Sequence, residues 1–206
     1  NFNIDKVTLG GPVFDLVKLG WVNNQHMKMK DLDELTRLTI PFFVNEGYLA
    51  NENISDKEFE TLKKIVEIER EGAKTLKEIA KNSKFFFVDE FSLPEVKEDM
   101  DKKERKSVER LLNSLKDEVG LKSIKLFIEK LEKWEGNEFT AEEAKDLLHS
   151  LLDDLQEGPG KIFMPLRAVL TGAAKGADLY NILYVIGKER ALKRIKDTIK
   201  KYNIIL

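Results

Sequence analysis

Residues 160–195 read GKIFMPLRAVLTGAAKGADLYNILYVIGKERALKRI, and this stretch carries the clearest structural signals in the chain. Proline suits the first turn of a helix because its missing N–H would have no partner there. We therefore expect a helix to start at Pro165 and to stop at Thr171-Gly172, followed by a second helix that breaks at Gly187 and restarts with basic residues. A helix start with Arg167 nearby predicts a cradle for an anion, with an ordinary helix cap as the alternative.

The rest of the chain predicts helices with little sign of strands, because apolar residues recur every three to four positions. Asp31 and Ser55 precede the first two segments as candidate N-caps, and Thr140 with Glu143 forms a capping-box pattern before the fourth. The third segment is expected to stop at Gly120. The apolar positions, segment by segment, are Leu32, Leu35, Leu38 and Phe42; Phe59, Leu62, Ile65 and Val66; Val108, Leu111, Leu112, Leu115 and Val119; and Ala144, Leu147, Leu148, Leu151 and Leu152.

A polar stretch with a proline, residues 89–105, separates the earlier helices from the later ones. It predicts two consecutive helical bundle subdomains, residues 31–92 and 93–206, in an all-α fold. The apolar run Phe85–Val88 just before it fits either a short strand or the buried end of a helix.

Charge is abundant but balanced, with 35 Lys and Arg against 37 Asp and Glu among 206 residues. Any site for a polyanion must therefore be local, and the basic run 188–201 is the obvious candidate, with a solvated helix face as the alternative. The chain has no cysteine, which fits a reducing cytoplasm. No membrane span or signal peptide is expected, and the start at Asn1 rather than Met leads us to expect a fragment.

Motifs for catalysis are missing from these residues. No phosphate loop, dinucleotide fingerprint, zinc-binding His pair or serine elbow occurs. His26 and His149 are expected to be surface or satisfied core residues, and paired acids such as Asp89-Glu90 are explained by solvation. We assign no catalytic residue and no metal ligand.

Three ordered blocks nevertheless resemble the C-terminal anticodon-binding portion of a bacterial glutamyl-tRNA synthetase, a class I aminoacyl-tRNA synthetase. Each block is weak alone, but their order and spacing run over almost the entire chain. The blocks are Gly11-Pro12-Val13-Phe14-Asp15 with Lys18-Leu19-Gly20-Trp21-Val22-Asn23; Lys74-Thr75-Leu76-Lys77-Glu78-Ile79; and Met164-Pro165-Leu166-Arg167 with Leu170-Thr171-Gly172 and Ile186-Gly187-Lys188-Glu189-Arg190.

The resemblance implies an all-helical tRNA-binding module in which residues 1–30 are the tail of the region that contacts the tRNA stem. It implies tRNA(Glu) as the partner, with no DNA or membrane partner, in a cytoplasmic monomer. In the full-length enzyme, glutamate would be attached to tRNA(Glu) with ATP and Mg. This fragment would hold no cofactor of its own.

The resemblance also suggests individual RNA contacts. It places Arg167 at the first anticodon base, with Gly176, Ala177 and Leu179 completing the pocket after the turn at Thr171. Gly176 and Ala177 replace the threonine and proline of some relatives, so backbone groups would have to replace a hydroxyl contact. Further candidates are Lys18, Trp21, Asn23, Lys74, Thr75, Lys77, Lys175, Lys188 and Arg190. For Trp21 we expect packing, with stacking on RNA or contact with the tRNA stem as the alternative.

The middle block departs from the family. Many relatives have an arginine three residues before the threonine of Lys-Thr-Leu, where it is expected to read the third anticodon base, and this chain has Gly72. Arg70 would point about 160° farther round a helix and replaces that arginine only if the backbone differs. We hypothesise that the third base is read permissively, so that tRNA(Gln) is accepted as well. The alternative is that Arg70 or another group reads this base.

Two other classes of function fit the composition. A helical protein-interaction module would explain the helices and the charge but not the three ordered blocks. A small-molecule enzyme would need a convergent polar site, and the sequence shows none.

Overall fold

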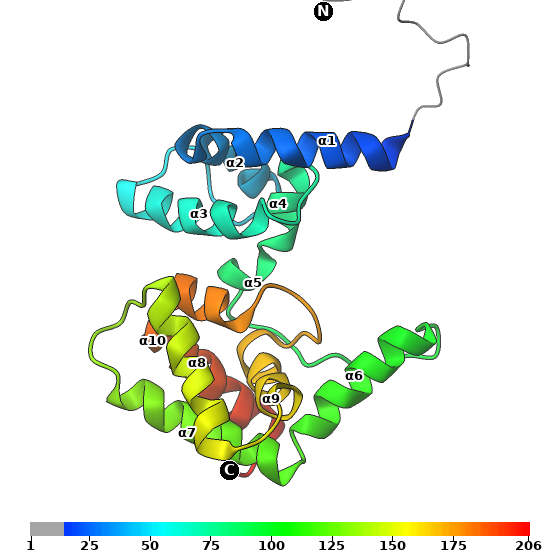
Figure 1. Cartoon of the computed structure of the whole chain (residues 1–206), viewed down its shortest axis with the longest axis vertical. Coiled ribbons are helices and arrows are strands. Elements are labelled where there is room, and N and C mark those ends of the chain that lie inside the picture. Colours follow the sequence, from blue (N-terminus) through cyan, green and yellow to red (C-terminus); the bar gives the residue numbers. More distant parts are fainter. Residues whose placement is uncertain (1–14) are drawn as a thin grey trace, which may run out of the picture.

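The computed structural model describes residues 15–206, which form ten α-helices and no β-strand (Figure 1). The all-α prediction is confirmed for this part of the chain. Residues 11–14 of the first block lie outside it. The helices are α1 Leu16–Met29, α2 Leu32–Asn45, α3 Asp56–Glu69, α4 Leu76–Asn82, α5 Lys84–Phe87, α6 Lys102–Ser114, α7 Glu118–Lys133, α8 Ala141–Leu155, α9 Pro159–Thr171 and α10 Leu179–Tyr202.

The helices gather in two groups along the long axis of the molecule (Figure 1). In the first group, α2, α3 and α4 pack on one another, and α1 lies over them. In the second group, α9 packs against α6, α7 and α10, while α8 packs against α7 and α10. The short α5 lies between the groups and contacts both α4 and α10, and α3 also touches α10.

Local signals set several helix starts in the way the sequence predicts. The Asp31 side chain accepts a hydrogen bond from the Glu34 N–H at 3.0 Å, and Ser55 and Thr140 both form complete capping boxes. The core stripe of α2 is predicted less well. Leu35 is buried, but Leu38 is 45% exposed, and Thr36 and Thr39 take inward positions instead.

The predicted helix end at Gly120 is wrong. Helix α6 ends at Ser114, and α7 begins at Glu118, so Gly120 lies in the first turn of α7. The reason for a glycine there is close approach, because a Cβ on Gly120 would lie only 2.0 Å from the Ser114 carbonyl oxygen. Gly120 therefore lets two helices meet at a sharp corner.

The predicted helix start at Pro165 is also wrong. Helix α9 begins at Pro159, and Pro165 is buried inside it, so it offers no free backbone donors for an anion. The end is as predicted, because Gly172 adopts a left-handed conformation with φ 64°. The break in α10 is confirmed at Gly187, where φ is 72° and ψ is 176°. A Cβ on Gly187 would lie 2.8 Å from the Asn137 carbonyl oxygen.

A buried arginine joins α5 to the second group. Arg194 on α10 is 1% exposed and donates to the Asp89 carboxylate at 2.8 Å and to the Phe85 carbonyl at 2.8 Å. Arg190 donates to the same carboxylate oxygen at 2.6 Å and to the Phe86 carbonyl at 2.7 Å. The expectation that solvation explains Asp89 is therefore wrong. We call the contacts of Asp89 with Arg190 and Arg194, together with the bonds of these arginines to the Phe85 and Phe86 carbonyls, the Asp89 clamp.

The run Phe85–Val88 is helical in its first three residues, which form most of α5, so the helix alternative is confirmed there. Residues 88–101 connect the two groups without a helix. Within residues 15–206, no helix combines the length and the apolar character that crossing a bilayer requires.

Candidate functional site

Arg167 lies on α9 and lines a cavity of about 220 Å³ beside the start of α10. Its Nη1 donates to the Ala177 carbonyl oxygen at 2.9 Å. Burial lowers the pKa of the guanidinium, and the nearby charge of Asp178 opposes that change. The side chain thus keeps further N–H donors in a partly desolvated cavity, which we call the Arg167 cavity. Leu179 and His149 also line it.

The turn after α9 is held by its own polar groups. The Thr171 hydroxyl donates to the Arg167 carbonyl at 2.8 Å and accepts from the Ala173 N–H at 3.2 Å. Gly176 has φ 145°, and a Cβ there would lie 2.6 Å from the Phe85 ring. This close approach fixes the turn against α5 and favours a glycine at this position.

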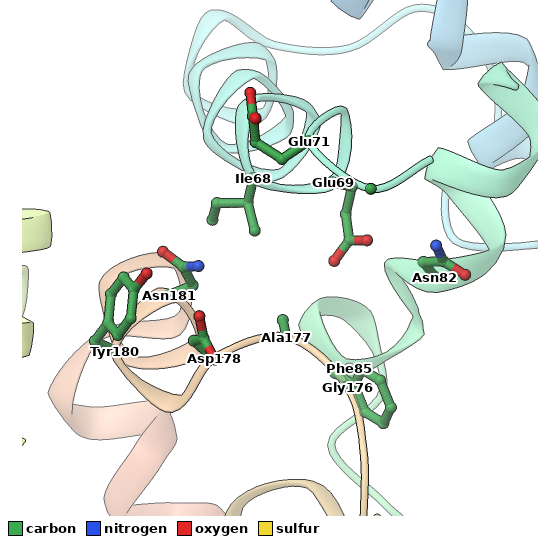
Figure 2. Close-up of a pocket in the computed structure, with 11 residues that line it drawn as sticks. Ile68, Glu69, Glu71, Asn82, Phe85, Gly176, Ala177, Asp178, Tyr180 and Asn181 are labelled. Carbon is green, nitrogen blue, oxygen red and sulfur yellow. The ribbon is translucent and has the colours of Figure 1, made fainter. Parts of the chain in front are cut away.

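A second, larger cavity of about 670 Å³ opens between the two helix groups (Figure 2). Its size lies in the range of roughly 300–1,000 Å³ that is common for ligand sites. We call it the inter-group cavity. Ile68, Glu69, Glu71 and Gly72 line it from the end of α3 and the following turn. Asn82, Phe85, residues 176–178, Tyr180 and Asn181 complete the lining.

The two cavities share one wall. Asp178 and Tyr180 line both of them, and Ala177 lines the inter-group cavity while its carbonyl holds Arg167. The structure therefore brings Arg167, Gly72, Gly176, Ala177 and Leu179 to two adjacent hollows.

Gly72 lies in the turn after α3, is exposed, and would have no atom within 4 Å of an added Cβ. The turn is fixed from α1, where Asn24 donates to the carbonyls of Arg70 at 2.8 Å and Ala73 at 2.7 Å. Arg70 caps the end of α3, its Nε is buried, and it is not among the residues that line the inter-group cavity. Space for a larger side chain thus exists at Gly72.

The middle block has a structural explanation in addition to any contact with RNA. The Thr75 hydroxyl caps α4 by accepting from the Glu78 N–H at 3.1 Å, and the Glu78 carboxylate accepts from the Lys74 N–H at 2.6 Å. Lys77 is exposed on α4. Lys74 and Lys77 carry the positive charges of this block, and neither lies among the residues that line the two cavities.

The second half of the first block, residues 18–23, lies on α1, and none of these residues lines either cavity. Asn23 donates to the Lys74 carbonyl, and Lys18 is exposed. Trp21 is 62% exposed, so the packing expectation for this side chain is wrong within the described residues. The neighbouring Asn24, which sequence reasoning missed, makes the stronger structural contribution through its two bonds to the α3–α4 turn.

The expected basic surface is only partly available. Lys188 donates to the Trp134 carbonyl at 2.7 Å, and Arg190 is held in the Asp89 clamp. The alternative that residues 188–201 form a solvated helix face is wrong for Arg194, because this side chain is buried. Lys175 is exposed on the turn between the cavities.

Glu69 is the functional candidate that sequence reasoning missed. Its carboxyl group points from the end of α3 into the inter-group cavity (Figure 2). Burial raises the pKa of this carboxyl to about 7, although a polar contact with the Asn82 side chain opposes the shift. No sequence signal distinguishes Glu69 from its acidic neighbours, because part of the cavity around it is lined by residues 176–181, which are more than a hundred positions away.

Within residues 15–206, no three His, Asp or Glu side chains gather as ligands of a metal ion would. The chemistry that the two cavities offer is hydrogen bonding, charge and aromatic stacking from Phe85 and Tyr180.

Comparisons with known proteins agree on one family. A family model described as "Anticodon binding domain" matches residues 34–199. The chain is 91% identical over 204 residues to a glutamate–tRNA ligase of Fusobacterium nucleatum, covering 99% of this chain and 40% of that protein. It is 35% identical over 196 residues to glutamate–tRNA ligase 1 of Caldicellulosiruptor saccharolyticus, covering 95% of this chain and 37% of that protein.

The fold is similar to that of a solved structure as well. The crystal structure of a glutamate tRNA ligase from Elizabethkingia meningosepticum in complex with its amino acid matches with a TM-score of 0.71 and 28% identity. The match covers 97% of this chain and 35% of that one. The chain therefore spans about two fifths or less of the length of these relatives.

Proposed function

Because this chain belongs to the anticodon binding domain family, we propose that it binds the anticodon of tRNA(Glu) as part of a glutamate–tRNA ligase. The observation that carries the proposal is the pair of adjacent cavities with a shared wall at residues 178 and 180. Unstacked bases of a single-stranded loop are bound in pockets with hydrogen-bonding and aromatic groups, and two pockets close together suit the first and third bases of one anticodon. The two cavities provide such groups side by side.

Arg167 would read the first anticodon base. One of its nitrogens is engaged by the Ala177 carbonyl, which orients the guanidinium and leaves other N–H donors for a base edge. Partial desolvation in the cavity strengthens the hydrogen bonds that the charged guanidinium donates. Leu179, which is 5% exposed, offers an apolar wall of the same cavity.

Substitution of this arginine tests the first-base assignment. Arg167→Ala should weaken binding of an anticodon stem-loop of tRNA(Glu) and reduce selectivity at the first base, as measured by fluorescence anisotropy. The control is Arg110→Ala, which removes an exposed arginine on α6. Equal stem-loop affinity for Arg167→Ala and the control would refute the assignment.

The inter-group cavity would receive the third anticodon base. The family arginine is replaced by Gly72, which supplies no side-chain donor and leaves open space. A cavity of about 670 Å³ has room for a purine as well as a pyrimidine. We therefore propose that the enzyme accepts tRNA(Gln), with G as the third base, in addition to tRNA(Glu), with C.

The test of permissive reading compares two stem-loops that differ only in C or G at the third position. The unmodified chain should bind them with comparable affinity, whereas a tenfold preference for C, about 1.4 kcal/mol, would contradict the proposal. Gly72→Arg should restore a preference for C, because at the Watson–Crick edge a guanidinium donates to N3 and O2 of cytosine but faces the N1 and N2 donors of guanine. Gly72→Ala is the matched control and should leave the ratio unchanged.

The wider context is part of the same proposal. In the full-length enzyme, ATP and Mg would serve the attachment of glutamate, and the protein would work in the cytoplasm as a monomer. Residues 1–30 would be the tail of the stem-contacting region, followed by anticodon-binding subdomains at 31–92 and 93–206. Lys18, Lys74, Lys77 and Lys175 would contact RNA phosphates, and Trp21 would stack on RNA or contact the tRNA stem.

A further inference from the structure

We propose that Glu69 is the residue that reads the third anticodon base, pairing as a carboxylic acid with cytosine and as a carboxylate with guanine. This inference rests on the function proposed above and deepens it. The family arginine is absent from the inter-group cavity, and Arg70 does not line it. The Glu69 side chain does, and its carboxyl group points into the open space (Figure 2).

The lining of the cavity favours a base over a phosphate. Glu69, Glu71 and Asp178 all contribute carboxyl groups, and none of the described residues that line the cavity is Lys or Arg. A phosphate would be repelled there, whereas a base edge with N–H donors would be attracted. Phe85 and Tyr180 add aromatic surface on which a base can stack.

Both bases have an edge that a carboxyl group can match. Cytosine presents an amino donor beside a ring-nitrogen acceptor, and a protonated carboxyl group offers an acceptor and a donor in the complementary order. Guanine presents a ring N–H beside an amino donor, and an ionised carboxylate accepts from both. The same side chain can thus pair with either base by losing or gaining one proton.

The environment of Glu69 allows both forms near neutral pH, since burial raises its pKa to about 7. The charged and titratable groups that face the cavity are Glu71 from the α3–α4 turn and Asp178 and Tyr180 from the start of α10. Burial and the charge of Asp178 raise the pKa of Tyr180, so this phenol stays neutral. Glu71 is paired with Lys28 at 2.7 Å, and its side chain is 65% exposed.

The proposal predicts opposite pH dependences for the two RNAs. The affinity for each base scales with the fraction of Glu69 in the matching form. Between pH 6 and pH 8, the Kd of the C stem-loop should rise by up to about tenfold, and the Kd of the G stem-loop should fall by up to about tenfold. The ratio of the two Kd values would then change by as much as about a hundredfold.

The experiment measures both Kd values by fluorescence anisotropy from pH 6 to pH 8 at constant ionic strength. Glu69→Gln removes the titrating group, so the Kd ratio should become independent of pH. Glu67→Gln is the matched control, because Glu67 is an exposed acid of the same helix that lines neither cavity, so its removal should leave the pH dependence intact. Titration of the bases themselves would appear equally in all three proteins.

The possible outcomes separate this inference from the proposed function. If neither stem-loop binds at any pH, the proposed function fails. If both bind but the Kd ratio of the unmodified chain is flat with pH, the role of Glu69 is refuted while anticodon binding stands. Retention of the full pH dependence in Glu69→Gln would refute it equally.

Discussion

Neutralising Asp89 tests what fixes α5, and with it the wall of the inter-group cavity. Asp89→Asn replaces the carboxylate, one oxygen of which accepts from both Arg190 and Arg194, with a neutral amide. Arg194 is 1% exposed, so its charge would lose its only acidic partner among the ion pairs of the described residues. Arg194 would keep its bonds to the carbonyls of Phe85 and Leu170.

The magnitude follows from the burial of the pair. Removing one partner of a fully buried ion pair costs about 3–5 kcal/mol. The Asp89 side chain is 34% exposed, and solvent screens its half of the interaction. We therefore expect Asp89→Asn to lower the free energy of unfolding by about 2 kcal/mol. Urea denaturation followed by circular dichroism at pH 7 measures this change.

The loss of stability caused by Asp89→Asn should become smaller as the pH falls. Burial raises the pKa of Asp89, but hydrogen bonds from Arg194 and Arg190 and their charges outweigh it, so the pKa is lowered overall. The stabilisation is complete above the unfolded value of about 3.9 and is lost as pH falls through the lower folded value. The unmodified chain and Asp89→Asn should therefore converge in stability below about pH 4.

The control is Asp99→Asn, because Asp99 is an exposed acid in the same connecting segment. This variant should change the free energy of unfolding by less than about 0.5 kcal/mol. If Asp89→Asn is no less stable than Asp99→Asn at pH 7, the Asp89 clamp does not hold α5 in place.

Three further results are expected. Thr75→Ala should cost about 1 kcal/mol of unfolding free energy by removing the cap of α4, seen as a lower Tm than that of Lys81→Ala, a variant at an exposed site of the same helix. Gly176→Ala should cost about 1–3 kcal/mol, because φ is 145° and the new Cβ would meet the Phe85 ring, whereas Gly160→Ala should not; equal Tm values would contradict the close approach. Stem-loop affinity should fall with salt, with a log–log slope of about −0.7 for each phosphate neutralised, and a flat response from about 50 to 200 mM would exclude phosphate contacts.

Local signals explain what the sequence predicts correctly. The caps at Asp31, Ser55 and Thr140 involve residues within three positions of one another, so a pattern of a few letters is enough to find them. The break at Gly187 and the end of α9 at Gly172 depend on backbone conformations that favour glycine. The resemblance to the glutamyl-tRNA synthetase family, carried by three ordered blocks, is also confirmed.

The errors arise where packing chooses between local alternatives. Pro159 and Pro165 both fit the first turn of a helix by their chemistry, and only the three-dimensional structure shows that α9 starts at the earlier one. Gly120 resembles a helix end, but the carbonyl of Ser114 comes so close that no side chain fits there. The partners of Asp89 lie 101 and 105 positions along the chain, beyond the reach of any periodicity.

The same distance in sequence explains why Glu69 could not be found before the fold was known. Its cavity exists because the 176–181 segment, which lies beyond the connecting segment in sequence, comes back to face the end of α3 beside α5. The Asp89 clamp ties α5 to α10, and Phe85 on α5 closes on Gly176, so the wall opposite Glu69 is held at two points. Arg167 holds a third point through the Ala177 carbonyl. With the wall held at these points, the proposed choice between C and G would depend on the protonation of one carboxyl group.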